Sequence, residues 1–393
     1  MRYLFSVALS LFLMLSACVY EPEQFVESEK EENPISSNSM TDMGSLYAVN
    51  DGKQICNPSV SQDTVNFPAS MLWLNFSGTL VVNKHDSDFT VKGVLQHDRL
   101  TVSDSANNVK WFLMRDTSKG ECQFQDPEWS THAEYIVALR GYDVKGRKTC
   151  ENLDYGIFAV RMSDKKRFWF YEKGIIEEAT PHIWVEPSVK AEKDGDVSTV
   201  KGFFGTDNVR LTYVNEKQNI VFVDYANGGL KKAKKLKKPA NRTDWNIDSP
   251  LISPDGNYVV YNMVESSTNW EAYIQELSEK STAVKLPRTK EMISEPAQPH
   301  WFEYDGRLFV VWAEFPAGSQ MLNKTDLNAA QDGSVGRTVM REVHLSAGAP
   351  KDFAVEWIGE NREIAPVPMT GGRSPDGKFL ATGTNKAYLL ELP

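Results

Sequence analysis

The sequence predicts an all-β protein: a six-bladed β-propeller of four-stranded antiparallel blades, with the ring closed by an N-terminal strand. Three observations predict this fold, namely a repeated Ser-Pro-Asp-Gly turn, six segment starts in a common frame, and a last segment too short to complete its own blade. The chain has 393 residues, of which 41% are hydrophobic and 24% are charged. This composition is near the globular average, and the length exceeds the ~100–200 residues of one ordinary domain, as a repeat assembly would.

The turn occurs twice, at Ser253–Gly256 and at Ser374–Gly377. Proline presets φ, aspartate bonds to its own backbone and glycine accepts a positive φ, so this order is typical of a tight turn. A run of hydrophobic, β-branched or aromatic residues follows each turn, over residues 258–261 and 379–381. The pattern therefore indicates a hairpin that enters a strand.

Prolines also recur at fixed offsets upstream of these turns. Pro250 lies five residues before Asp255, and the same offset separates Pro58 from Asp63. Corresponding positions start six units, at Pro58, Pro127, Pro181, Pro250, Pro299 and Gly371. The starts are spaced by about 63 residues on average, which is longer than the ~40–45 of a WD40 blade. A unit of this length has room for four strands of ~5–6 residues and long loops.

The final unit determines how the ring closes. Only 17 residues follow Asp376, enough for about two further strands. Because an open edge strand invites aggregation, we expect residues 45–49 to supply the missing outer strand and close the ring.

The order of a proline, an apolar residue, Ser-Pro-Asp-Gly and a hydrophobic strand resembles the repeat of TolB-type six-bladed β-propellers. The resemblance covers roughly residues 45–393; it is close in the fourth and sixth units, fair in the second and fifth, and poor in the first and third. It implies a fold and no particular chemistry. The alternative architecture is a pair of β-sandwiches in which the turns recur by coincidence.

The N-terminus predicts the compartment. Arg2 is followed by an apolar stretch over residues 3–15 and then by Ser16, Ala17 and Cys18. A positive start, a short apolar region and small residues before the cleavage point are typical of a secretory signal peptide. Residues 15–18 resemble the lipobox of bacterial lipoproteins, in which cleavage leaves a lipid-carrying cysteine at the mature N-terminus.

That resemblance implies a signal peptide over residues 1–17 and a lipid on Cys18. Val19, a residue other than Asp after the cysteine, implies sorting to the outer membrane, where the protein would face the periplasm or the cell surface. Residues 18–44 carry six glutamates and little hydrophobicity, which predicts a flexible acidic tether. The propeller then occupies residues 45–393.

Three cysteines follow Cys18, and no two of them have the spacing of a metal-binding pair. In an oxidising envelope compartment, one disulfide and one free thiol are the simplest outcome. Cys122 precedes the first strand of the second predicted blade and Cys150 follows its second strand, so antiparallel order brings both to one end of the blade. We therefore favour a structural Cys122–Cys150 disulfide, with Cys56 as the competing partner.

The first strand of each propeller blade lines the central channel, so the residues after the start positions converge on the ring axis. Five of them are Ser59, Glu128, His182, Leu251 and His300. Glu128, His182 and His300 are candidate channel-mouth residues, either as a metal or ligand site or as ordinary polar groups wetted by channel water. No ligand-type spacing supports a metal, and we expect neither a metal nor a cofactor.

The loops at the same end of the ring carry the candidate binding face. Arg242 and Trp245 lie in one predicted loop, and Asn269 and Trp270 in another. Trp and Arg are favoured at protein interfaces, and Trp also stacks on sugars. A loop over residues 314–337 exceeds the usual ~12–15 residues and suggests a further binding element. The alternative is that the two tryptophans pack between blades.

Six lysines lie within residues 230–238 of a chain whose net charge is −10. They would contact anionic envelope polymers or lipid head groups, or, as we favour, protect a solvated loop or edge strand from pairing. Because the chain as a whole lacks a basic footprint, nucleic acid is not expected as a partner.

Catalytic signatures are absent from the sequence. It contains no G-x-S-x-G, H-E-x-x-H, phosphate-loop or Rossmann pattern, and no catalytic residue is assigned. The sequence favours a lipid-anchored envelope module that binds a protein or a polysaccharide through its loop-bearing face. The alternative is a carbohydrate-active enzyme of the glycoside hydrolase type, because two channel carboxylates from different blades would suffice. A structural subunit of an envelope assembly is a third hypothesis.

The lipid anchor has a direct test. Cys18→Ala removes the thiol that would carry the lipid, and each buried CH₂ of a lipid chain contributes about 0.8 kcal/mol. The variant should therefore move from the membrane to the soluble fraction, as measured by cell fractionation. Ser36→Ala in the tether is the control, and unchanged membrane retention of Cys18→Ala would contradict the anchor.

Overall fold

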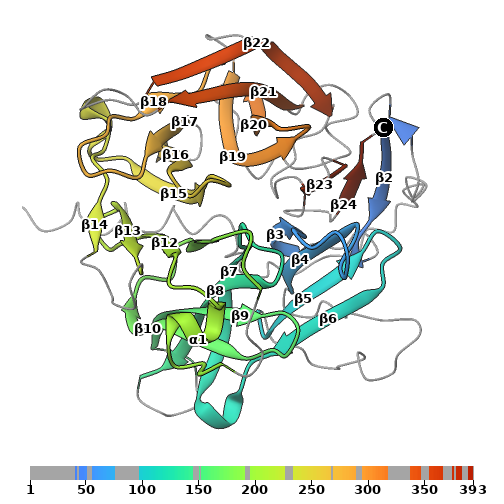
Figure 1. Cartoon of the computed structure of the whole chain (residues 1–393), viewed down its shortest axis with the longest axis vertical. Coiled ribbons are helices and arrows are strands. Elements are labelled where there is room, and N and C mark those ends of the chain that lie inside the picture. Colours follow the sequence, from blue (N-terminus) through green and yellow to red (C-terminus); the bar gives the residue numbers. More distant parts are fainter. Residues whose placement is uncertain are drawn as a thin grey trace, which may run out of the picture.

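The computed structural model describes residues 40–41, 44–50, 55–75, 97–144, 150, 152–190, 195–225, 233–266, 269–288, 294–316, 337–346, 354–365, 374–375, 378–382 and 388–392. These residues form six four-stranded sheets, which stand around a common centre in Figure 1. Neighbouring strands within each sheet are antiparallel. The predicted six-bladed β-propeller is confirmed, and the two-sandwich alternative is wrong.

Five blades are built from consecutive strands. Blade 1 contains β3 (Ile55–Val60), β4 (Ser70–Asn75), β5 (Arg99–Asp104) and β6 (Val109–Met114). Blade 2 contains β7 (Glu121–Trp129), β8 (Tyr135–Asp143), β9 (Leu153–Arg161) and β10 (Arg167–Ile175). Blade 3 contains β11 (His182–Val185), β12 (Val209–Val214), β13 (Ile220–Asp224) and β14 (Lys234–Lys235). Blade 4 contains β15 (Asn246–Ile252), β16 (Tyr258–Ser266), β17 (Asn269–Glu276) and β18 (Val284–Lys285). Blade 5 contains β19 (Ser294–Tyr304), β20 (Arg307–Pro316), β21 (Arg337–Ser346) and β22 (Ala354–Ala365).

Blade 6 joins the two ends of the chain. Its strands, in order across the sheet, are β23 (Phe379–Thr382), β24 (Tyr388–Glu391), β2 (Gly44–Ala48) and β1 (Met40–Thr41). β2 pairs with β24 from Ser45 opposite Glu391 to Ala48 opposite Tyr388. The predicted closure by an N-terminal strand is confirmed. The start position Gly371 lies outside the described residues.

The hairpin between the first two strands is closed in the same way in three complete blades, and the turn before β23 repeats it. In each case a serine N–H donates to the carbonyl of the residue that begins the next strand, at 2.9–3.0 Å. The four serines are Ser61, Ser130, Ser253 and Ser374. The frame found in the sequence is therefore a structural repeat.

The blade 4 turn also contacts its neighbour. The indole N–H of Trp184 in β11 donates to the Pro254 carbonyl at 2.7 Å. Gly256 has a φ of +78°, and a Cβ at this position would lie 2.6 Å from the Trp184 ring. Glycine is therefore required here both for its backbone conformation and for the close approach of the indole.

The hydrophobic core is divided among the junctions between blades. Each of six clusters combines side chains of two neighbouring blades, so every blade packs through both of its faces. The largest joins blades 2 and 3 and includes the aromatic group of Tyr135, Phe168, Phe203 and Phe204. Phe203 and Phe204 belong to α1 (Val200–Phe204), a helix capped by the Thr199 hydroxyl.

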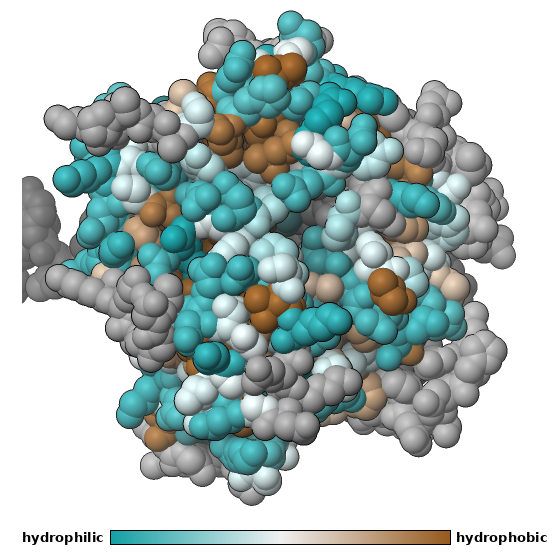
Figure 2. All heavy atoms as spheres, viewed as in Figure 1, coloured by the Kyte–Doolittle hydropathy of each residue, from teal (hydrophilic) through white to brown (hydrophobic). Residues whose placement is uncertain are grey.

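The three short helices lie in loops. Besides α1, the part of the chain that the structure describes contains two 3₁₀ helices, Thr117–Lys119 and Ala240–Arg242. No helix among the described residues is long and apolar enough to cross a membrane. Figure 2 shows that the face viewed along the ring is mostly hydrophilic, with hydrophobic side chains in separate groups, the largest at the top over the β19–β22 blade.

The closing strand should contribute strongly to stability. Leu46 is 3% exposed and packs between blades 5 and 6, so Leu46→Ala should lower the free energy of unfolding by about 2–5 kcal/mol. Tyr47→Phe on the same strand is the control, because it removes only the hydrogen bond to Glu391 and should cost about 1 kcal/mol or less. Denaturant unfolding measures both, and equal small losses would contradict the role of β2 as a closing strand.

Candidate functional site: the central channel

The first strands of blades 1 to 5 bring their start positions to the ring axis. The residues that follow the prolines line one pocket together: Ser59, Glu128, His182, Leu251 and His300. We call this the post-proline pocket. The three candidate channel-mouth residues, Glu128, His182 and His300, are therefore brought together, as their equivalent places in the repeat predict.

A second pocket adjoins the first and shares Glu128, Leu251 and His300 with it. It is lined by the residues that precede the five prolines, which are Asn57, Asp126, Thr180, Ser249 and Gln298, and by Asp248. We call it the pre-proline pocket. Sequence reasoning missed these residues, although the sequence carries a signal for them: every residue before a start proline is polar.

All five pre-proline residues share an unusual backbone. Their φ angles are positive, at 46°, 44°, 39°, 50° and 50° in chain order. In four blades the pairing of the first two strands shifts register across this step, as in a β-bulge, which redirects a side chain. A positive φ is uncommon outside glycine, and Thr180 is β-branched, which makes it a true outlier. Such strain gathers at functional sites and costs about 1–3 kcal/mol per residue.

Hydrogen bonds link the pre-proline residues into two groups. The Asn57 amide donates to Asp126 at 2.6 Å, and the Thr180 N–H donates to the other oxygen of Asp126 at 3.2 Å. The Ser249 hydroxyl donates to Asp248 at 3.0 Å, and the Gln298 amide donates to the other oxygen of Asp248 at 3.0 Å. Both carboxylates are thus held from two sides by neighbouring positions of the ring.

The two aspartates have perturbed ionisation. Burial, and then the negative charge of Asp248, raise the pKa of Asp126 to about 7. Burial also raises the pKa of Asp248, against the hydrogen bonds from Ser249 and Gln298 that lower it. Glu178 nearby has a raised pKa for the same leading reason. None of the described residues that line either pocket is Lys or Arg, so no lining cation compensates the carboxylates.

Glu128 stands where the two pockets meet. It accepts a hydrogen bond from the Ser59 hydroxyl, which in turn accepts one from the Trp129 N–H at 2.9 Å. Burial raises the pKa of Glu128 to about 8 in spite of these contacts. The side chain is therefore a neutral acid near pH 7.

The two histidines of the channel differ in what their ring nitrogens do. Nδ1 of His182 accepts the Ile252 N–H at 2.9 Å, which ties blade 3 to blade 4. Nδ1 of His300 lies 2.9 Å from the Gln298 carbonyl and must donate, because a carbonyl only accepts. Burial lowers the pKa of His182 to about 3 and that of His300 to about 4, so both rings are neutral near pH 7. No group of three or more His, Cys, Asp or Glu among the described residues is arranged to hold a metal ion.

The two tryptophans of the expected binding face are buried, as in the alternative in which they pack between blades. Trp245 and Trp270 are 6% and 7% exposed; the first packs between blades 3 and 4, and the second packs on blade 5 beside Phe315. Arg242 covers Trp245 at 4.4 Å and forms an ion pair with Glu271 at 2.8 Å. The physical reason is that burying an indole between blades removes more apolar surface from water than a loop can.

The structure also describes Asn269, both ends of the predicted long loop, and two of the clustered lysines. The Asn269 amide donates to Glu265 within blade 4. The loop predicted over residues 314–337 begins and ends in β20 and β21, and residues 317–336 lie outside the described residues. Lys234 and Lys235 form β14, the outer strand of blade 3, which agrees with the interpretation of the lysines as protection of an edge strand.

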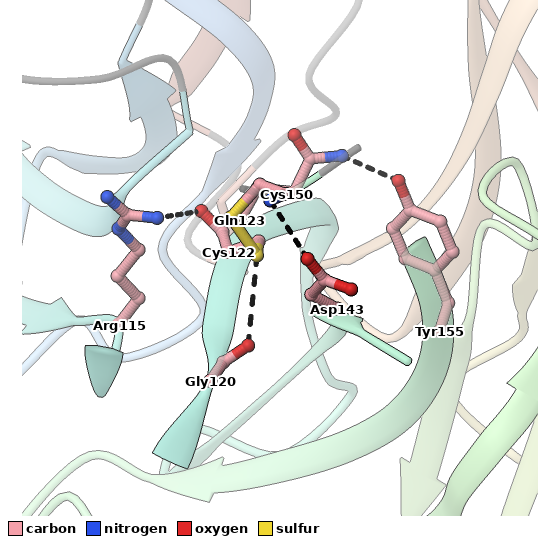
Figure 3. Close-up of a disulfide and its surroundings, with 7 residues drawn as sticks. All are labelled: Arg115, Gly120, Cys122, Gln123, Asp143, Cys150 and Tyr155. Atoms are coloured by element: carbon pink, nitrogen blue, oxygen red, sulfur yellow. Dashed lines mark hydrogen bonds between the residues drawn. A yellow bond between two sulfur atoms is a disulfide. The ribbon is translucent and has the colours of Figure 1, made fainter. Parts of the chain in front are cut away.

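The structure joins Cys122 and Cys150 by a disulfide, the pairing that the sequence favours, with Cα atoms 5.6 Å apart. Figure 3 shows the bridge between the start of β7 and the loop after β8, where the Cys150 N–H donates to Asp143 at 3.2 Å. The Gln123 amide donates to the Tyr155 hydroxyl at 2.6 Å close by. The bridge lies at the edge of blade 2 and has a structural role.

Cys56 does not remain as a free thiol. No cysteine among the described residues is free, so the simplest outcome expected from the cysteine count is wrong. Cys56 is 2% exposed, packs in the cluster between blades 1 and 2, and lines the pre-proline pocket.

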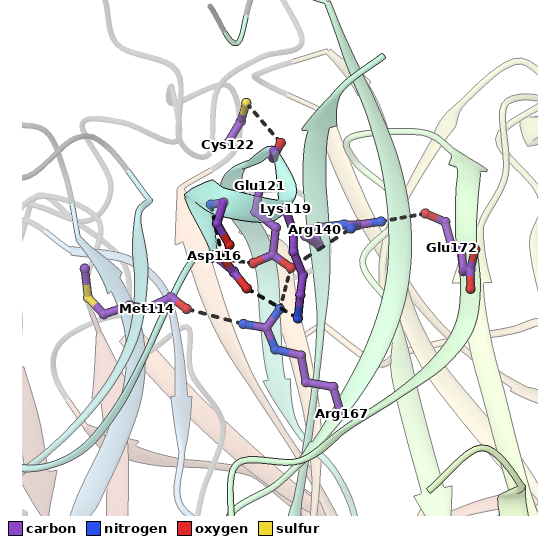
Figure 4. A network of polar contacts seen from close by, with 10 residues as sticks. Met114, Asp116, Lys119, Glu121, Cys122, Arg140, Arg167 and Glu172 are labelled. Carbon is purple, nitrogen blue, oxygen red and sulfur yellow. Dashed lines mark hydrogen bonds and ion pairs between the residues drawn. The ribbon is translucent and has the colours of Figure 1, made fainter. Parts of the chain in front are cut away.

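A buried ion cluster stabilises the same end of blade 2. Figure 4 shows Arg167 and Arg140 around Glu121, at 2.6 Å and 4.0 Å from one carboxylate oxygen. Arg140 also lies over the rings of Tyr142 and Trp169, at 4.6 Å and 4.3 Å. Because these charges are paired with one another, we assign the cluster a structural role.

Comparisons with known proteins find similar solved structures but no family. No family model matches the chain, and no curated protein matches it. Similar solved structures include an oligogalacturonate lyase in complex with manganese, at 12% identity over 87% of this chain and 78% of that chain with a TM-score of 0.36. TolB from Acinetobacter baumannii is similar at 11% identity over 83% and 64% of the two chains, with a TM-score of 0.42. An exo-1,5-alpha-L-arabinanase from a bovine ruminal metagenomic library is similar at 11% identity over 77% and 97%, with a TM-score of 0.35.

The buried acid of the channel predicts a pH dependence of stability. In the unfolded chain Glu128 ionises near its ordinary pKa of 4.5, whereas in the fold its pKa is about 8. Its contribution to stability is complete below the unfolded value and is lost as the pH rises through the folded value. Between about pH 5 and pH 9, the free energy of unfolding should therefore fall by about 4 kcal/mol more in the native protein than in Glu128→Gln.

Urea unfolding at a series of pH values measures this difference. The channel histidines are common to both proteins, so their opposite effect at acidic pH cancels in the comparison. Glu303→Gln, at an exposed position of the same pocket, controls for the loss of one negative charge. Equal pH slopes for the native protein and Glu128→Gln would show that Glu128 ionises normally in the fold.

Proposed function

We propose that the protein is a ligand-binding propeller of the bacterial envelope and that its ligand binds in the pre-proline pocket on the ring axis. The observation that carries the proposal is the repeated backbone strain: five blades hold a polar residue at positive φ, and all five line the same pocket. Strained residues cluster at active sites and ligand clamps, where the surrounding structure over-determines their conformation. Pockets with a few convergent polar groups and perturbed ionisation are the usual binding sites.

The location is also part of the proposal. The lipobox at Cys18 and the acidic tether after it favour a lipid-anchored protein of the outer membrane. The partner would then be an envelope protein or a polysaccharide. Because Trp245 and Trp270 are buried, the axial pocket replaces the aromatic loop face as the proposed binding surface.

Glycoside hydrolysis is the second candidate, favoured by the paired carboxylates of Asp126 and Asp248 in one pocket. Such catalysis uses one protonated acid and one ionised carboxylate, whose environments push their pKa values apart. Here burial pushes both pKa values upward. This shared direction supports binding over hydrolysis.

The binding proposal is tested with the full-length protein, purified in detergent. Immobilised native protein and the double variant Asp126→Asn/Asp248→Asn are compared against purified outer-membrane proteins and surface polysaccharides by surface plasmon resonance. We expect at least one ligand to bind the native protein and to lose tenfold or more in affinity for the double variant, because the ligand loses two acceptors held in place by the ring.

Glu303→Gln is the matched control and should bind as the native protein does. Equal affinity of every ligand for the native protein and the double variant would exclude the pre-proline pocket as the site. Release of sugars from a polysaccharide by the native protein, but not by the double variant, would establish the hydrolase instead.

A further inference from the structure

The pre-proline pocket offers a ligand mostly hydrogen-bond acceptors. Most of its side-chain donors point at its own carboxylates, since Asn57 donates to Asp126, and Ser249 and Gln298 donate to Asp248. The Thr180 hydroxyl is the exception, because it has no partner among the described residues. Each carboxylate oxygen can accept two hydrogen bonds, so all four oxygens retain capacity for a ligand. A sugar hydroxyl needs both donors and acceptors, whereas an ammonium or a guanidinium only donates.

His300 provides a second and independent indication. Its side chain is 8% exposed and lines both pockets. Because Nδ1 donates to the Gln298 carbonyl at 2.9 Å, the tautomer is set and Nε2 is a bare acceptor. Among the described residues Nε2 has no hydrogen-bond partner. An acceptor on a pocket-lining residue that has no partner within the described residues can accept a hydrogen bond from a donor on a ligand.

The walls of the pocket limit the shape of that ligand. The pocket lining also includes five apolar residues, which we call the apolar collar: Ile55, Pro58, Pro127, Pro181 and Leu251. A collar of this kind suits an aliphatic stem that carries a charge at its end, as in Lys and Arg. A bare metal ion would gain nothing from it, and the described residues contain no group of three ligands for a metal.

We propose, on the basis of the function proposed above, that the pre-proline pocket binds a basic side chain, Lys or Arg, of a partner polypeptide. The methylene stem contacts the apolar collar. The cationic head donates to Asp126 and Asp248, and His300 Nε2 accepts a further N–H. No Lys or Arg lines the pocket among the described residues, so the partner supplies the cation that the site lacks.

The test uses small probes on the full-length protein, purified in detergent. Nα-acetyl-lysine methylamide and Nα-acetyl-arginine methylamide are titrated into protein with labelled histidine, and the imidazole signals are followed by NMR. The neutral controls are the norleucine and citrulline analogues, which keep the stem and lack the charge. The signals of His300 are assigned with His300→Gln.

We expect a saturable shift of the His300 signals with at least one cationic probe and at least tenfold weaker binding of its neutral analogue. Asp126→Asn and Asp248→Asn should each weaken the binding of that probe tenfold or more, whereas Glu303→Gln should bind it as the native protein does. If only the lysine probe or only the arginine probe gives this result, that probe carries the preferred head group. Equal binding of the charged and neutral probes, or no effect of the aspartate variants, would overturn the inference.

The two experiments together distinguish a failure of this inference from a failure of the proposed function on which it rests. If an envelope ligand depends on Asp126 and Asp248 but the Lys and Arg probes neither bind nor compete with it, the ligand class is wrong and the pocket stands. If no ligand and no probe depends on the two aspartates, both proposals fail.

Discussion

The packing of each blade against its two neighbours is the interaction on which the rest of the structure depends. Six hydrophobic clusters lie at the six junctions, so no blade has a core of its own. Each junction needs both blades, and the sixth needs Leu46 from β2 and Leu390 from β24. The ring therefore stabilises itself only when it is closed, and closure places the first strands of blades 1 to 5 around one axis.

Polar contacts complete the junctions near that axis. Residues 70 positions apart make equivalent bonds between adjacent blades, from the Trp129 N–H to Ser59 and from the Ile252 N–H to His182. Ser59 and His182 therefore both join neighbouring blades and line the post-proline pocket. Ser59 Oγ and His182 Nδ1 bond the neighbouring blade, whereas His300 Nδ1 bonds the Gln298 carbonyl of its own blade.

The pre-proline residues show how the stable ring carries a strained site. Five positive φ angles, each costing about 1–3 kcal/mol, are tolerated because neighbouring blades over-determine the geometry. The strain holds Asp126 and Asp248 in fixed positions with two hydrogen bonds each. A site built in this way is organised before a ligand arrives, which reduces the entropy that binding must overcome.

The sequence by itself determined the repeat, the turns and the closing strand, because tight turns and alternating strands depend on residues close together in the chain. It also determined that Glu128, His182 and His300 would meet, since equivalent positions of a repeat occupy equivalent places around an axis. Tertiary structure alone decided that Trp245 and Trp270 are buried, because their exposure depends on the neighbouring blade. It likewise decided the raised pKa values of Asp126 and Asp248, since the burial of both and the repulsion of Asp126 by Asp248 arise only when blades 2 and 4 face the same pocket.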